Sequence, residues 1–170
     1  MHAMRLAART LATAALVSAG AVVSAKEAPR VPPCSASHLA AADAGTKTFD
    51  GRRVTTIIVV NNSASTCFLG GYPQIRFASF SQVAPPVALN DTAVDADYKT
   101  PGPTSIVLGS LRRVSFLLGY SNTNDPKNPC ASISTIDIVV GPPAHSGTVT
   151  LPDTIAPCGT LDVSPFFLSR

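Results

Sequence analysis

Short runs rich in Val, Ile, Thr and Phe recur along the sequence, and they restrict the fold more than any other feature. Gly, Pro, Asn or Asp bounds each run, which is the pattern of strands separated by turns. Within one run, Ile136, Ile138 and Val140 occupy alternate positions, as in a half-buried strand. Short strands at this spacing predict an all-β protein, a two-sheet sandwich of about seven to nine strands. The runs predict strands at residues 53–60, 74–80, 105–110, 113–120, 134–140, 147–151 and 160–168.

One segment departs from the strand pattern. Residues 35–45, SASHLAAADAG, form the one stretch that favours a helical turn, and Gly45 would end it. The sequence contains no internal repeat and no long linker, so a single domain is expected.

The first 25 residues have the three-part layout of a secretory signal peptide. Arg5 and Arg9 form a basic start, an apolar run extends from Leu11 to Val23, and small residues precede an expected cleavage after Ala25. A short membrane anchor is the alternative, and no later segment is apolar for long enough to span a bilayer. We therefore expect a secreted, extracellular protein, with retention at the cell envelope as a second possibility. The predicted organisation is a signal peptide at 1–25, a flexible Pro-rich N-terminus at 26–33 and a single β-sandwich domain at 34–170.

Removal of the signal peptide changes the charge of the chain. Lys and Arg fall from 13 to 11 because Arg5 and Arg9 are lost, and the 10 Asp and Glu remain, which leaves a net charge of +1. Nucleic-acid or anionic-membrane binding requires clustered Lys and Arg, so the overall charge does not support either. The paired arginines in GRR at 51–53 and LRR at 111–113 are interpreted as solvated starts of strands.

All four cysteines follow the predicted signal peptide: Cys34, Cys67, Cys130 and Cys158. An even number in a secreted chain predicts two disulfides, and four cysteines permit three pairings. We favour Cys34–Cys67 with Cys130–Cys158, because each bond then closes a loop of about 30 residues within one half of the chain. A zinc site would need short Cys-x-x-Cys spacing, which is absent from the sequence.

The stretch NNSASTCFLGGYP at 61–73 concentrates unusual residues behind an apolar strand. Asn tolerates left-handed backbone, Ser and Thr bond locally, and the two glycines permit backbone angles that are closed to other residues. Each unusual residue therefore has a structural use. We interpret the stretch as an inter-strand connection pinned by a disulfide.

The order of these motifs resembles the domain of unknown function family 4232. A cysteine precedes an apolar strand that ends in Asn, CFLGGYPQIRF follows, and VLGSLRRVSFLLGYSN, NPCASISTIDIVV and APCGTLDVSPF complete the pattern over residues 34–168. The resemblance implies a secreted or lipid-anchored bacterial protein, an immunoglobulin-like Greek-key sandwich with the two disulfides favoured above, and no established activity. Family members often place a tryptophan in the strand before the third cysteine. This chain has no tryptophan, so Tyr120 or Phe116 is expected to fill that core position.

The residues give no support for catalysis, a cofactor or a metal. After the signal peptide the histidines are His38 and His145, both in loop or turn context, and no serine occupies a Gly-x-Ser-x-Gly elbow. We therefore expect no enzyme and name no catalytic residue, metal ligand or cofactor. The segments NNS at 61–63 and NDT at 90–92 fit the glycosylation acceptor pattern but are interpreted as turn residues in a bacterial protein.

The long connection at 81–104 is the candidate binding surface, because loops of this length are often functional. Its most polar part contains Asp91, Asp95, Asp97 and Tyr98. Calcium favours carboxylates, but the spacing lacks the Asp-x-Asp-x-Asp-Gly of a formed calcium loop. We expect a monomeric module that binds a protein, glycan or envelope component through its loops. The alternative is a small-ligand or ion carrier, or an enzyme, with a pocket between the sheets.

Overall fold

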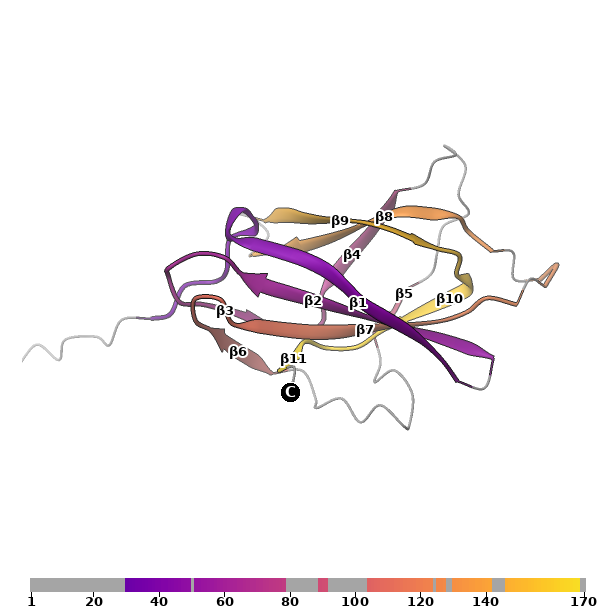
Figure 1. Cartoon of the computed structure of the whole chain (residues 1–170), viewed down its shortest axis with the longest axis horizontal. Helices are drawn as coiled ribbons and strands as arrows, with labels where there is room; N and C mark the ends of the chain where they lie inside the picture. Colours follow the sequence, from indigo (N-terminus) through magenta and orange to yellow (C-terminus); the bar gives the residue numbers. More distant parts are fainter. Residues whose placement is uncertain are drawn as a thin grey trace, which may run out of the picture.

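The computed structural model of the protein describes residues 30–49, 51–78, 89–91, 104–123, 125–127, 130–141 and 146–168. The predicted signal peptide at 1–25 lies outside these ranges. No helix within them is long and apolar enough to cross a bilayer. The described chain is built almost entirely of β-strands, which confirms the all-β prediction (Figure 1).

The larger sheet contains six strands in the order β1–β2–β7–β10–β5, and β11 pairs with the start of β7. All of its pairings are antiparallel except that of β5 with β10. Strands β1 and β2 form a hairpin whose turn lies at one end of the molecule, and the turn between β6 and β7 lies at the other (Figure 1). The strands are β1 (Leu39–Phe49), β2 (Arg52–Asn61), β7 (Arg113–Ser121), β10 (Cys158–Val163), β5 (Leu89–Asp91) and β11 (Phe167–Leu168).

Two smaller antiparallel sheets pack against the larger one. One has the order β4–β8–β9, and the other pairs β3 with β6. Buried side chains from all three sheets form one continuous core cluster, so the arrangement is the predicted sandwich. These strands are β4 (Gln74–Ala78), β8 (Ile133–Val140), β9 (Gly147–Ile155), β3 (Cys67–Gly70) and β6 (Ser105–Leu108).

The alternation of side chains along β2 shows why the sheet has an inner face. Ile57 and Val59 are fully buried in the core, whereas the intervening Ile58 is half-buried on the opposite face. Ile57 lies opposite Phe116 of β7, and the Phe116 ring meets that of Phe166 edge-on at 5.6 Å. Burial of such residues supplies the main driving force of the fold, about 1.5–3 kcal/mol for each large apolar side chain.

Strand β7 is the central element of the larger sheet. Its residues from Val114 to Tyr120 are all buried, because Leu117 packs with Val54 and Phe167 on the face away from the main core. Phe116 and Tyr120, the two aromatic residues expected to fill a core position, are both fully buried.

Both disulfides have the predicted pairing. Cys34 bonds to Cys67, which attaches the start of the described chain to β3, and Cys130 bonds to Cys158 at the start of β10. Pro32 and Pro33 also lie along β3: the Phe68 amide donates to the carbonyl oxygen of Pro32 at 2.9 Å. Covalent and backbone contacts together hold this corner of the sandwich.

The helical turn predicted at 35–45 is wrong for most of its length. Only Ala36–His38 forms a single 3-10 turn, named η1, and the chain then enters β1 at Leu39. Strand β1 pairs with β2 from Leu39 to Phe49, with a bulge between Asp43 and Thr46. A continuous partner strand outweighs the weak local preference of an alanine-rich segment. Gly45 does not end a helix; it takes the left-handed backbone of the bulge, with φ of 112°.

The other predicted strands are present, with shifted ends. The run at 160–168 divides into β10 and β11, because Ser164 interrupts the pairing with β7. Its hydroxyl accepts a hydrogen bond from the Leu117 amide at 2.8 Å, and its own amide donates to the Leu117 carbonyl at 3.0 Å. The sequence analysis missed β1, β3 and β5, which are edge or very short strands.

Candidate functional site

Asn61 ends β2 and connects two turns through its buried side chain. The amide nitrogen donates to the carbonyl oxygens of Ser65, Leu108 and Gly109 at 2.8, 3.0 and 3.2 Å. The Oδ1 atom accepts from the backbone amide and the hydroxyl of Ser63 at 3.0 and 2.8 Å. Asn61 therefore uses both of its polar atoms inside the fold, which leaves no amide nitrogen for a glycan at the NNS segment.

The backbone of Asn61 fixes the turn between β6 and β7. Its amide donates to the carbonyl oxygen of Arg112 at 3.0 Å, and its carbonyl accepts from the Leu111 amide at 2.8 Å. The Arg112 amide closes the turn by donating to the carbonyl oxygen of Gly109 at 3.2 Å. Because these bonds hold Gly109, Leu111 and Arg112, the side chains of the turn are presented in a defined position.

Leu111 has an unusual conformation at this turn. Its φ is 57°, and it is the one non-glycine residue with positive φ among the described residues. A left-handed backbone costs a leucine about 1–2 kcal/mol, and Gly or Asn is normally found at such a position. The side chain is also 75% exposed, the most exposed of the large apolar residues in the described chain. Strain of this kind is concentrated at binding and functional sites.

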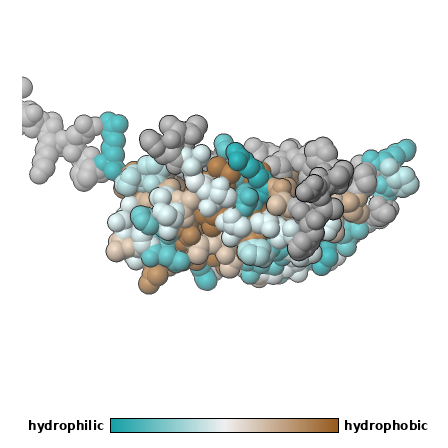
Figure 2. Space-filling view, turned by 90° about the horizontal axis from the view of Figure 1, so that it is seen from above, coloured by the Kyte–Doolittle hydropathy of each residue, from teal (hydrophilic) through white to brown (hydrophobic). Residues whose placement is uncertain are grey.

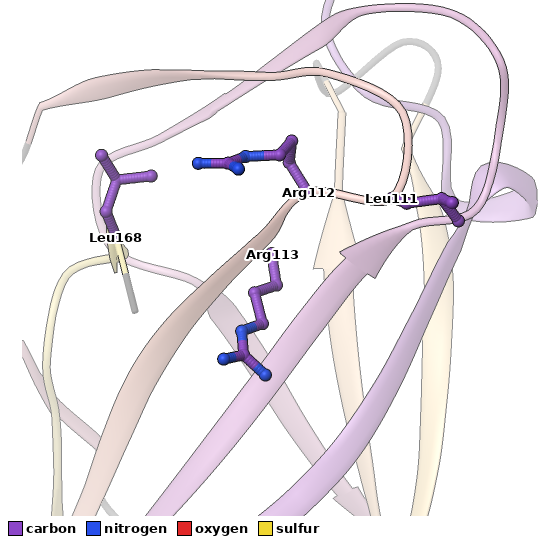
Figure 3. Close-up of a pocket in the computed structure, with 4 residues that line it drawn as sticks. All are labelled: Leu111, Arg112, Arg113 and Leu168. Carbon is purple, nitrogen blue, oxygen red and sulfur yellow. The ribbon is translucent and has the colours of Figure 1, made fainter. Parts of the chain in front are cut away.

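The turn borders a surface hollow of about 440 Å³, lined by Leu111, Arg112, Arg113 and Leu168 (Figure 3). We call this feature the turn-end hollow. The Arg112 guanidinium extends toward Leu168, while Arg113 extends away from it along the other side of β7. Leu168 belongs to β11 and reaches the site because it pairs with Val114 at the start of β7.

The charge at the turn-end hollow is uncompensated within the described residues. Arg112 and Arg113 are exposed, and neither side chain forms an ion pair or hydrogen bond with a described residue. Four of the described acids have partners elsewhere: Asp162 pairs with Arg52, Asp137 accepts from Thr150, Asp125 from Lys127 and Asp43 from Gly45. The site therefore combines exposed leucine side chains with two positive charges that are unpaired within the described part of the chain.

A second hollow, of about 300 Å³, is almost entirely apolar. It lies beside β3, where Phe68 and Gly70 face the end of β8 at Val140, and Phe166 closes one side. The Phe166 amide donates to the carbonyl oxygen of Gly71 at 3.0 Å, which fixes this wall. Its lining is Pro33, Phe68, Leu69, Gly70, Val140, Gly141 and Phe166. We call it the apolar hollow.

Surface hydropathy distinguishes the two ends of the molecule. Apolar side chains are seen in the left-hand and central parts of the view in Figure 2, and the left-hand part is the end where Figure 1 places β3 and β6. The opposite end, toward the β1–β2 turn, is more hydrophilic. Both hollows therefore lie toward the more apolar end.

Asp43 and Asp153 bring two carboxylates close together where β1 meets β9. The Oδ2 atom of Asp153 is buried and has no hydrogen-bond partner among the described residues. Loss of solvation is the main cause that raises the pKa of Asp153 above its ordinary value, and repulsion by Asp43 is the second. A hydrogen bond from the Thr154 backbone lowers this pKa and opposes both. Within the described ranges, no three His, Cys, Asp or Glu side chains come together in a way that could hold a metal ion.

The binding residues predicted in the long connection lie almost entirely outside the described residues. Asp95, Asp97 and Tyr98 are among them, as is His145. Asp91 ends β5, where its backbone lies opposite Val163, and its side chain is not described. His38 is exposed on η1.

The turn-end hollow was not predicted from the sequence. The paired arginines in LRR were interpreted as a solvated strand start, and Arg113 does begin β7. The informative signal was Leu111, an apolar residue between turn residues and two arginines. Leu168 could not have been assigned to the same site, because 57 residues of sequence separate it from Leu111.

Comparison with known proteins places this chain against one family. The model of a domain of unknown function, DUF4232, matches residues 34–166. No curated protein matches the chain, and no solved structure does.

Proposed function

This chain belongs to the DUF4232 family, and on that premise we propose that it is a non-catalytic extracellular binding module. It binds a component of the cell envelope through the end of the sandwich that carries the turn-end hollow. The two disulfides support an extracellular location, because such bonds persist in oxidising compartments.

One observation carries the proposal: a turn that is rigidly held presents an exposed, conformationally strained leucine beside two arginines that have no ion-pair partner among the described residues. A turn with only a connecting role would be more stable with Gly or Asn in place of Leu111. Arginine is also one of the residue types that are enriched among the main contributors of binding energy at interfaces.

Site-specific photocrosslinking tests the proposal. A benzophenone amino acid is placed at Leu111 or, as a control, at Phe49, an exposed apolar residue of β1 near the opposite end. Each protein is irradiated with cell-envelope fragments of the organism that encodes it. We expect covalent adducts from position 111 in large excess over position 49. Equal yields at both positions, or no adduct from either, would refute the proposed binding surface.

The apolar hollow supports a second candidate function, binding of a small apolar ligand. Its volume is near the lower end of the range of about 300–1,000 Å³ for small-molecule sites, and its walls are apolar. Native mass spectrometry of the secreted protein tests this function. A reproducible additional mass, lost when Gly70 or Val140 is replaced by a larger residue, would support it, and a bare polypeptide mass would exclude a retained ligand.

A further inference from the structure

We propose that the turn-end hollow docks the protein on an anionic lipid membrane surface. The inference rests on the proposed envelope-binding function and specifies the chemistry of the partner. The arginines meet lipid phosphates, and the exposed leucines contact the acyl-chain boundary.

The charges select an anionic partner. Arg112 and Arg113 are adjacent in the chain, both exposed, and neither is neutralised by a described side chain. A guanidinium presents several donors in a planar fork that matches phosphate oxygens. The hollow that both residues line is open to solvent and large enough for a lipid headgroup, at about 440 Å³.

The apolar side chains distinguish a membrane from a soluble anion. Leu111, Val107 and Leu168 are the three most exposed large apolar residues of the described chain, at 75%, 59% and 58%. Leu111 and Leu168 line the hollow together with the arginines, and Val107 lies in β6, which precedes the turn. A free phosphate would leave these side chains in water, whereas the interfacial region of a bilayer accommodates apolar groups beside cations.

The rigidity of the turn favours insertion of Leu111. The backbone bonds with Asn61 hold the turn in place, so the leucine does not have to be ordered on binding. In its left-handed conformation the Leu111 side chain is already 75% exposed, so it needs no rearrangement to reach the partner. The turn therefore already has its binding conformation in the free protein.

The association is expected to be weak and reversible. Few apolar side chains are available, so a partition coefficient at or below that of one myristoyl chain, about 10⁴ M⁻¹, is reasonable. Each arginine raises the partition coefficient about fivefold near an anionic surface, and two together raise it about 30-fold. The attraction should weaken strongly with salt, since exposed charges are screened over about 10 Å at about 0.1 M.

Vesicle cosedimentation tests the inference, with the protein purified from a host that secretes it. One set of vesicles contains phosphatidylglycerol mixed with phosphatidylcholine, and the other contains phosphatidylcholine alone. We expect binding to the anionic vesicles, at least tenfold weaker binding to the neutral ones and a comparable loss at about 0.5 M salt. Soluble dihexanoyl phosphatidylglycerol below its micelle concentration should compete poorly, because it offers the headgroup without a bilayer.

Two variants and a matched control locate the binding. Arg112→Gln/Arg113→Gln should lose about 30-fold in partition coefficient. Leu111→Asn introduces a residue that tolerates left-handed backbone, and its partition coefficient should be about tenfold lower. Lys47→Gln/Arg53→Gln removes the same charge from exposed residues of the β1–β2 hairpin and should bind as the unaltered protein does. Circular dichroism of each variant confirms that it is folded.

Three results would overturn the inference: no binding to anionic vesicles, equal binding to neutral vesicles, or an equal loss in the control variant. The last would mean that net charge rather than the turn-end hollow drives association. These results are distinguishable from failure of the proposed function. Protein or glycan adducts from position 111, without vesicle binding, would retain the binding surface and reject only the lipid partner.

Discussion

The side-chain amide of Asn61 donates a hydrogen bond to the carbonyl oxygen of Leu108 at 3.0 Å, across 47 residues of sequence. Asn61 ends β2 in the larger sheet, and Leu108 ends β6 in a smaller one. The bond therefore joins two sheets at the point where the chain passes from β6 to β7. Because Asn61 and Leu108 are both fully buried, water cannot replace the lost partner if either group is removed.

Replacement of Asn61 by Ala should destabilise the protein by about 2–4 kcal/mol, because a buried carbonyl that loses its donor costs about 1–3 kcal/mol and several bonds are lost together. Urea unfolding followed by circular dichroism measures the change. Asn62→Ala is the control: Asn62 is exposed, and its one bond to a described residue is that of its backbone amide to the His38 carbonyl at 2.8 Å. That variant should stay within about 0.5 kcal/mol of the unaltered protein. Equal effects at the two positions would contradict the role assigned to the Asn61 side chain.

Replacement of Leu111 by Asn should stabilise the protein by up to about 1 kcal/mol, because asparagine adopts positive φ with less strain. Thermal unfolding measures the gain. Leu168→Asn provides a control with similar loss of exposed apolar surface and no positive φ, and it should give no gain. A destabilised Leu111→Asn variant would show that the leucine makes a stabilising contact in the free protein.

The stability of the protein should depend on the ionisation of Asp153. Its pKa is higher in the folded protein than in the unfolded chain, so the folded state binds the proton more tightly. Ionised Asp153 therefore reduces stability at neutral pH, and this loss disappears as the pH falls through the folded pKa. Asp153→Asn should raise the unfolding free energy at about pH 7, by less than about 1 kcal/mol because the carboxylate is partly solvated.

The same gain should vanish at about pH 3, where the acid is protonated in both states. Urea unfolding at the two pH values measures the difference. Asp43→Asn removes the neighbouring charge but keeps an acceptor for the Gly45 amide, and it should shrink the effect of Asp153→Asn. A gain from Asp153→Asn that is equal at both pH values would mean that charge is not its cause.

Gly147 lies where β9 passes close to η1. A Cβ atom added to Gly147 would lie 2.7 Å from the Cβ atom of Ala36, closer than two non-bonded carbon atoms normally approach. Gly147→Ala should therefore cost about 1–3 kcal/mol, the range for overpacking. The double variant Gly147→Ala/Ala36→Gly removes the clash and should recover most of the loss. Urea unfolding of the single and double variants measures this coupling, and strictly additive effects would refute the contact.

The strands that alternate apolar residues could be predicted from the sequence, and β2, β7 and β8 appear where the pattern indicated. The alternation of Ile57 and Val59 with exposed or half-buried neighbours encodes burial on one face, which local sequence reports directly. The sequence also favoured the observed disulfide pairing, since each bond closes a loop within one half of the chain.

Strand β1 could not be predicted from the sequence, and the reason is physical. Its alanines and Gly45 carry no strand preference of their own, and it becomes a strand because β2 offers a full row of backbone partners. Edge strands such as β3 and β5 are equally short of local signal, because their few residues are ordered by neighbours that are distant in sequence.

The sequence by itself determined the all-β class and the positions of the main strands, and it favoured the two cysteine pairs, because these depend on alternation and spacing along the chain. Only the tertiary structure decided that Asn61 unites two turns, that Leu111 is held in left-handed backbone, and that Leu168 joins Arg112 and Arg113 around one hollow. The physical reason is that a binding surface is made of side chains that the core excludes. Hydrophobic patterning specifies which residues are buried, but the contacts of the folded sheets decide which excluded residues meet.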